Sequence, residues 1–260
     1  MNVALGDAKG KGMDSFTLKL IALCFMILDH LHTHLWFYAT WPQWLSIVTR
    51  FVSPLFLYLM VEGFYHTRSR KKYLIRLFVA ALIMMSGNIA INLTFHNVSS
   101  STGKYTYFSL TGPNNIFLTL ALLFALVWCL ENVKSRKKRI PNILLALLFA
   151  FLCLFSEGGV VMLPMAVIIW FFHEKKSMQC IFIGAYCLVL LIHALISYTG
   201  NSTLYSYLCF DNEWAMFLVI PFILAYNGKR GVNTLFSKYM FYVIYPVHIW
   251  ILMIVNFVFG

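Results

Sequence analysis

A chain of 260 residues that is 61% hydrophobic and only 11% charged, with a mean hydropathy of +0.78, does not have the composition of a water-soluble domain. The formal net charge of +11 does not indicate nucleic-acid binding either, because the basic residues lie in short clusters between apolar runs rather than on one polar surface. These properties predict an integral membrane protein with several spans and no nucleic-acid partner.

Nine apolar segments approach or reach the roughly 20 residues that a helix needs to cross a bilayer. They predict an all-α fold, a polytopic transmembrane helical bundle of about nine spans, over residues 16–38, 47–65, 73–95, 114–131, 142–155, 158–172, 180–199, 214–227 and 239–259. The fifth, sixth and eighth segments are short for complete spans, so 142–172 also suits a helical hairpin or a re-entrant pair. We expect one transmembrane domain over residues 14–260, preceded by a disordered cytoplasmic N-terminus over residues 1–13.

The basic residues predict the orientation of these spans. With the N-terminus in the cytoplasm, 18 of the 20 lysines and arginines fall on the inner side, and only Arg50 and Lys104 fall outside. This asymmetry is the one that the positive-inside bias predicts. We therefore expect a multi-pass protein, surrounded by membrane lipids, with its N-terminus cytoplasmic and its C-terminus outside.

The first span, FTLKLIALCFMILDHLHTHLWFY at 16–38, carries an acid and three histidines in its outer half. An ionisable side chain at membrane depth is costly unless it is paired or wetted, so Asp29 and His30 require a reason to be there. At about 1.5 Å of rise per residue, His30 lies about 21 Å from the inner end of this span, and His248 lies about 14 Å into the last span. These depths favour a catalytic role for Asp29, His30 and His248.

Asp29 and His30 are neighbours, and neighbours on an α-helix point about 100° apart, so Asp29 is poorly placed to orient the His30 ring. We expect the acid to pair with a group on another helix, for which His248 is a candidate. One of the two histidines would then act as general base, and the sequence leaves open which one. His30 and His34 have i, i+4 spacing, but no HExxH motif accompanies them, so no metal is expected.

Further polar residues are predicted at a similar depth. Asn88 and Asn92 lie one turn apart in the outer half of the third span, and Glu157 lies in an outer connection. A water-accessible cavity between helices would use the asparagines to stabilise an oxyanion and Glu157 to face the acceptor. The alternative is that the asparagines hydrogen-bond across a helix interface and serve only packing.

A turn rich in glycine and cations follows the eighth span on the inner side, and it consists of Tyr226, Asn227, Gly228, Lys229, Arg230 and Gly231. Glycines let backbone N–H groups approach an anion, and the two cations supply charge, so this turn is a candidate phosphate site. Arg76 and the cations at 68–72 would line the same mouth. The alternative is a basic turn that obeys the positive-inside bias alone.

Four stretches stand out together: LKLIALCFMILDH at 18–30, FVSPLFLYLMVEGFYHTRSRKKYLIRL at 51–77, YNGKRG at 226–231 and KYMFYVIYPVHIW at 238–250. They resemble the TraX family of conjugal-transfer pilin acetyltransferases. The resemblance implies a multi-span enzyme of the bacterial inner membrane that moves an acetyl group from acetyl-CoA to the N-terminal amine of pilin. It also implies a distant similarity to membrane acyltransferases that O-acetylate sugars, in which a first-span histidine is catalytic.

Position by position, the resemblance matches family motifs at Asp29 and His30, at Glu62 and Gly63, at residues 227–231, and at Tyr245, Pro246 and His248. The sequence departs at 156–159, where SEGG stands in place of an expected Asp-Tyr-Gly type, and this departure concerns the acceptor. We expect acetyl-CoA-dependent acetylation of an acceptor reached from the membrane or the outer side, foremost a pilin-like or other peptide amine. O-acetylation of a glycan or lipid is the alternative within enzymes, and a transporter or scaffold is the alternative outside them.

Overall fold

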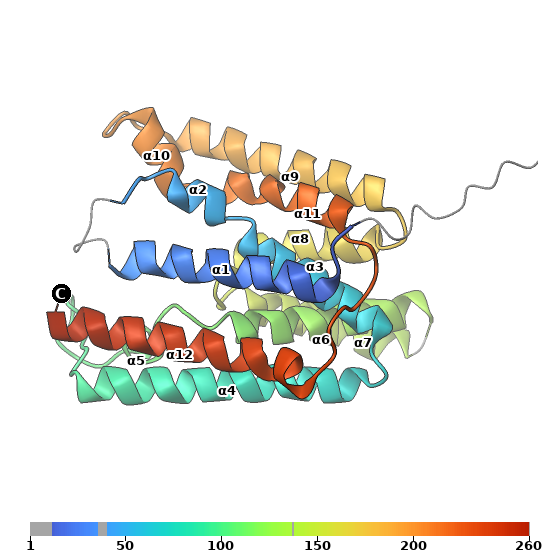
Figure 1. The fold of residues 1–260 in the computed structure, drawn as a ribbon, viewed down its shortest axis with the longest axis horizontal. Coiled ribbons are helices and arrows are strands. Elements are labelled where there is room, and N and C mark those ends of the chain that lie inside the picture. The colour runs from blue at the N-terminus through green and yellow to red at the C-terminus, as the bar shows by residue number, and fades with distance from the viewer. Residues whose placement is uncertain (1–11, 36–40, 137, 260) are drawn as a thin grey trace, which may run out of the picture.

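The computed structural model describes residues 12–35, 41–136 and 138–259, so most of the segment predicted to be disordered lies outside it. The described residues form helices and no strand ladder, which confirms the predicted all-α class. In chain order (Figure 1) they are α1 (Ser15–His34), α2 (Leu45–Thr49), α3 (Val52–His66), α4 (Arg70–Thr94), α5 (Tyr107–Thr111), α6 (Ile116–Lys134), α7 (Arg139–Cys153), α8 (Gly159–Phe171), α9 (Lys176–Ser197), α10 (Leu204–Phe210), a 3-10 helix (Glu213–Val219), α11 (Ile220–Ala225) and α12 (Leu235–Phe259).

Among the described residues, six helical segments are long and apolar enough to cross a membrane, namely α1, the α2–α3 segment Leu45–His66, α4, α6, α9 and α12. The number rises to seven if α10 and Glu213–Ala225, which are bent by 66°, form one span. The predicted nine spans and the predicted orientation of the termini are not confirmed. The prediction of nine included 142–155 and 158–172, but α7 and α8 have only 15 and 13 residues. They are about 22 and 20 Å long, against a hydrocarbon core of roughly 30 Å.

α7 and α8 form a hairpin that enters the bundle and returns to the same edge. In Figure 1 both helices run between the edge where α6 ends and α9 begins and a turn that stops short of the opposite edge, which α1, α4 and α12 reach. The turn is tight, because a Cβ atom on Gly159 would lie 1.7 Å from the carbonyl oxygen of Cys153. This geometry matches the re-entrant alternative for 142–172 and places Glu157 at the tip of the hairpin.

α3 and α6 are the central helices of the bundle. Nine residues of α3 and 11 of α6 are buried, against four each in α1 and α9. The outer helices expose large apolar side chains, such as Ile181, Val189 and Ile196 of α9. Apolar faces of this kind suit lipid rather than water, so the chain is a membrane protein.

Close packing between α4 and α12 holds the helix that carries His248. A Cβ atom on Gly87 of α4 would lie 2.1 Å from Cζ2 of Trp250, and the Trp250 indole also donates a hydrogen bond to Asn88 Oδ1 at 3.1 Å. The ring is therefore fixed on two sides. We expect Gly87→Ala to lower the free energy of unfolding by about 1–3 kcal/mol, the usual cost of overpacking.

Thermal unfolding in detergent measures this effect, with Gly184→Ala as the matched control. Gly184 also lies within a long apolar helix, but the nearest side-chain atom to its Cβ position is 3.8 Å away, an ordinary contact. We expect this control to be neutral or slightly stabilising, because alanine favours helix. Equal melting temperatures for the two variants would contradict close packing at Gly87.

Candidate active site

A cavity of about 810 Å³ runs through the bundle between α1, α3, α4, α6 and α12. Its wall includes both Ser15 and His30 of α1, so it follows that helix for about 22 Å. One end is cationic and is lined by Lys19, Arg68, Arg76, Arg230 and Lys238. The other end is lined by Asp29, His30, Thr49, Arg50, Glu157 and Tyr245. A volume of this size is typical of small-molecule sites, and the two ends differ in chemistry.

His30 and His248 are in direct contact, although they are 218 positions apart in the sequence. Nδ1 of His30 lies 2.7 Å from Nε2 of His248, and the rings are stacked with centroids 5.0 Å apart. The other ring nitrogen of His248, Nδ1, lies 2.7 Å from the backbone oxygen of Ile244, one turn earlier in α12. The structure therefore brings together the two histidines that the sequence placed at similar depth.

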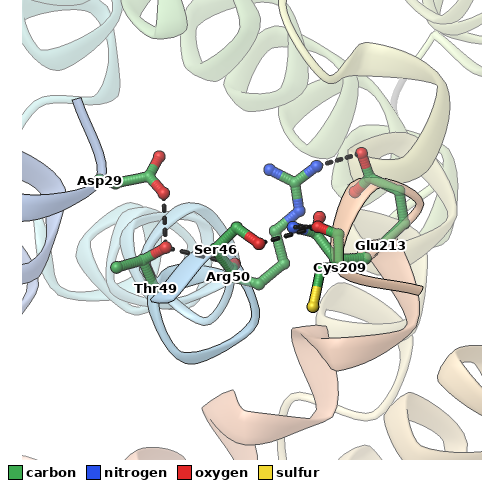
Figure 2. Close-up of polar contacts among 7 residues, drawn as sticks. Asp29, Ser46, Thr49, Arg50, Cys209 and Glu213 are labelled. Carbon is green, nitrogen blue, oxygen red and sulfur yellow. Dashed lines mark hydrogen bonds and ion pairs between the residues drawn. The ribbon is translucent and has the colours of Figure 1, made fainter. Parts of the chain in front are cut away.

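Asp29 does not contact His248, the partner that its position in the sequence suggested. The hydroxyl group of Thr49 in α2 donates a hydrogen bond to Asp29 Oδ1 (Figure 2). His248 contacts His30 instead. Asp29 points away from the His30 ring because the two residues are neighbours on one helix. The carboxylate thus links α1 to α2 at the wall of the cavity.

Arg50 was considered above only for its charge, yet its side chain lines the cavity. Its guanidinium group forms an ion pair with Glu213, and nearby Ser46 donates to the Cys209 backbone oxygen at 2.8 Å (Figure 2). Its Nε atom is buried and has no hydrogen-bond partner among the described residues. One signal in the sequence could have found this residue, since Arg50 is one of only two cations predicted on the outer side.

Glu157 lies in the connection between α7 and α8, and this connection reaches the cavity wall. The hydroxyl group of Tyr245 donates to Glu157 Oε2 at 3.2 Å, and that of Thr119 donates to the Glu157 backbone oxygen at 2.8 Å. With 142–155 and 158–172 as full spans this connection would lie outside the bundle, whereas the re-entrant alternative for 142–172 places it within. The hairpin is too short to cross and instead carries Glu157 into the interior.

Only part of the predicted phosphate turn lines the cavity, and the rest contacts the start of α1. Tyr226, Gly228 and Arg230 line the cavity together with Arg76, whereas Asn227, Lys229 and Gly231 are not in its wall. The adjacent cations Lys229 and Arg230 therefore differ in position, which the sequence could not show.

The other half of this turn holds the start of α1. The backbone N–H of Met13 donates to the Ala225 oxygen at 2.8 Å, and that of Ser15 donates to the Lys229 oxygen at 2.9 Å. Gly231 has a φ of +74°, and a Cβ atom there would lie 2.4 Å from Cγ of Asp14. Gly12 and Met13, which were included in the predicted disordered segment, are thus paired with the turn.

Asn88 and Asn92 are buried and do not line the cavity. Asn88 Nδ2 donates to the Thr111 oxygen at 2.7 Å, and Asn92 Nδ2 donates to the Leu110 oxygen at 2.8 Å. Their side-chain oxygens accept from Trp250 and Asn97 at 3.1 and 2.8 Å. These amides join α5 to α4, as the packing alternative describes. Within the described residues, no three His, Cys, Asp or Glu side chains are grouped so as to hold a metal ion.

The fold and the site define a class: a helical membrane protein with one elongated cavity, whose wall holds three carboxyl groups, several cations and His30, which contacts His248. The chain belongs to the TraX family, whose "TraX protein" model matches residues 15–256. This match confirms the resemblance drawn from the four sequence stretches. The chain is also similar to a probable fimbrial assembly protein, FimC of serogroup H1, from Dichelobacter nodosus. The two are 29% identical over 239 residues, which cover 90% of this chain and 92% of that protein. No solved structure matches the chain.

Proposed function

We propose that this protein is an acetyl-CoA-dependent acetyltransferase of the bacterial inner membrane and that its acceptor is the N-terminal amine of a pilin-like peptide. The observation that carries the proposal is the cavity, because one space joins a cationic mouth to His30, which contacts His248. Membership of the TraX family and similarity to a fimbrial assembly protein support a place in pilin processing.

The cationic mouth fits the phosphates of acetyl-CoA. Arg76, Arg230 and Lys238 lie in its wall, and guanidinium groups bind phosphate through parallel N–H donors. From the mouth the cavity continues for about 22 Å along α1, which suits an extended pantetheine arm. The predicted orientation places this mouth in the cytoplasm, the compartment that supplies acetyl-CoA.

At the end of the cavity that contains His30, side chains of this protein would transfer the proton of the acceptor and stabilise the negative charge that develops on the acetyl oxygen. Bound acetyl-CoA supplies an acetyl thioester, the electrophile of the reaction. The two histidines would take the proton of the attacking amine and return it to the departing thiol. Arg50 in the same wall would stabilise negative charge on the acetyl oxygen, a role first predicted for Asn88 and Asn92, whose amide groups are engaged elsewhere.

The polar wall also favours one acceptor class. Two carboxyl groups, those of Asp29 and Glu157, lie at the same end as His30. Ionised carboxyl groups attract a basic amine, which is charged in water, more strongly than a neutral hydroxyl group. The bound ammonium group releases one proton to solvent and then attacks as a neutral amine. This arrangement supports N-acetylation over the O-acetylation of a glycan or lipid.

The test uses purified protein in nanodiscs with acetyl-CoA radiolabelled in its acetyl group. We expect saturable binding and transfer of label to a peptide with a free N-terminal amine, but not to the same peptide with a formylated N-terminus. Transfer to an oligosaccharide or lipid instead would favour the O-acetyltransferase. Absence of acetyl-CoA binding by well-folded protein would overturn the proposal and favour a transporter or scaffold.

A further inference from the structure

The hydrogen bonds of the two histidines have a definite direction. His248 Nδ1 lies 2.7 Å from the Ile244 backbone oxygen, and a carbonyl oxygen only accepts, so Nδ1 of His248 carries a proton. A neutral imidazole has one N–H group, so Nε2 of His248 is an acceptor. His30 Nδ1, which lies 2.7 Å from that atom, must therefore donate. The lone pair of the His30 ring is left on Nε2.

This lone pair belongs to the ring that lines the cavity. His30 is part of the cavity wall, whereas His248 is not. In the described part of the chain, the His30 ring makes no hydrogen bond other than the one to His248. The opposite proton arrangement would place a lone pair of His248 Nδ1 against the Ile244 oxygen, and these two groups would repel each other.

We propose that His248 is a positioning residue that fixes the Nδ1–H tautomer of His30 and accepts that proton during catalysis, so that His30 Nε2 is the general base. This inference rests on the proposed acetyl transfer and assigns roles within its site. Nε2 of His30 binds the proton released by the acceptor, and the Nδ1 proton moves to Nε2 of His248. The reverse transfer returns one proton to the departing thiol, so both rings end as they began.

The carbonyl group of Ile244 completes this arrangement. A second proton on the His248 ring makes it an imidazolium, and its Nδ1–H then forms a charge-assisted hydrogen bond to the Ile244 oxygen. The positive charge is thereby held on the ring that is not in the cavity wall. His30 returns to a neutral state while the reaction proceeds in front of it.

The direct test is the tautomeric state of the two rings. Protein with ¹⁵N-labelled histidine, reconstituted in nanodiscs, would be studied by NMR, with His30→Gln and His248→Gln variants used to assign the ring signals. We expect protonated Nδ1 and unprotonated Nε2 on both rings in the wild type. In His248→Leu, we expect His30 to shift toward the Nε2–H form that histidine favours in water. A wild-type His30 protonated on Nε2, or a tautomer unaffected by His248→Leu, would overturn the proposal.

The second test is kinetic and includes rescue by a conservative variant. We expect His248→Leu to lower kcat by about 100-fold, the low end of general-base effects, while the Kd for acetyl-CoA stays unchanged. His248→Gln should retain more activity, because its side-chain oxygen still accepts from His30 Nδ1. His193→Leu in α9, an exposed histidine on a span, is the matched control and should behave as wild type. Equal losses in the Leu and Gln variants would contradict the positioning role.

These two tests separate the inference from the function on which it rests. Should His248→Leu fail to fold, the wild-type tautomers still decide the proposal. Should the wild type transfer no acetyl group, the proposed function fails, whereas the NMR measurement still reports whether His248 sets the state of His30.

Discussion

Replacement of His30 by alanine should reduce acetyl transfer by about 10²- to 10⁴-fold, the range that a general base contributes. The physical reason is that His30 presents the accessible ring nitrogen of the histidine pair to the cavity. The affinity for acetyl-CoA should change little, because the cationic mouth lies about 22 Å farther along α1. Single-turnover transfer from labelled acetyl-CoA, measured beside equilibrium binding, separates these two quantities.

His32→Ala is the matched control for this prediction. His32 lies on the same helix two residues later, but its ring faces Trp41 with a centroid distance of 6.4 Å, and it is not in the cavity wall. His30→Gln, which retains most of the side-chain volume, shows whether a loss comes from chemistry rather than from a packing defect. Wild-type transfer rates in both His30 variants would remove this residue from the mechanism.

Replacement of Arg230 by alanine should weaken acetyl-CoA binding by about 10- to 100-fold. A hydrogen bond to a charged group contributes about 1.5–3 kcal/mol, and about 1.4 kcal/mol corresponds to a tenfold change in Kd. Lys229→Ala should change the Kd by less than about threefold, because both side chains are exposed but only that of Arg230 lies in the cavity wall. Equilibrium binding of labelled acetyl-CoA at low and high salt measures both effects.

The two variants control for each other, because each removes one positive charge and the two positions are adjacent in the same turn. Equal weakening by the two variants would mean that only the general positive charge at this end of the protein attracts the ligand. No weakening in Arg230→Ala would place the phosphates elsewhere. Arg76→Ala, in α4 at the same mouth, should add to the loss in Arg230→Ala if both side chains contact phosphate.

The first and last spans were the most predictable part of the site. A helix rises by a constant amount per residue, so counting from the ends of two apolar segments placed His30 and His248 at similar depth. That reasoning did not reveal their direct contact or its direction. Both depend on the packing of α1 against α12 and on the Ile244 carbonyl beside the ring.

The side-chain partners of Glu157 and Asp29 could not be predicted from the sequence. Glu157 was predicted in an outer connection because two short apolar runs were counted as spans, whereas the α7–α8 hairpin brings it to the hydroxyl of Tyr245. Asp29 was expected to find a partner on another helix, and it did, but that partner is Thr49. Neither contact follows from residue type, since many hydroxyl groups occur in the apolar segments.

The sequence by itself determined that this is an all-helical membrane protein of the TraX family with ionisable groups at membrane depth, because hydropathy, motifs and helical rise are local properties. Only the tertiary structure decided which of those groups share a cavity. The pairs His30 and His248, Thr49 and Asp29, and Tyr245 and Glu157 meet through packing between different segments. The same packing places Arg230 in the cavity wall and Lys229 outside it. This difference cannot be predicted from the sequence, in which the two cations are adjacent.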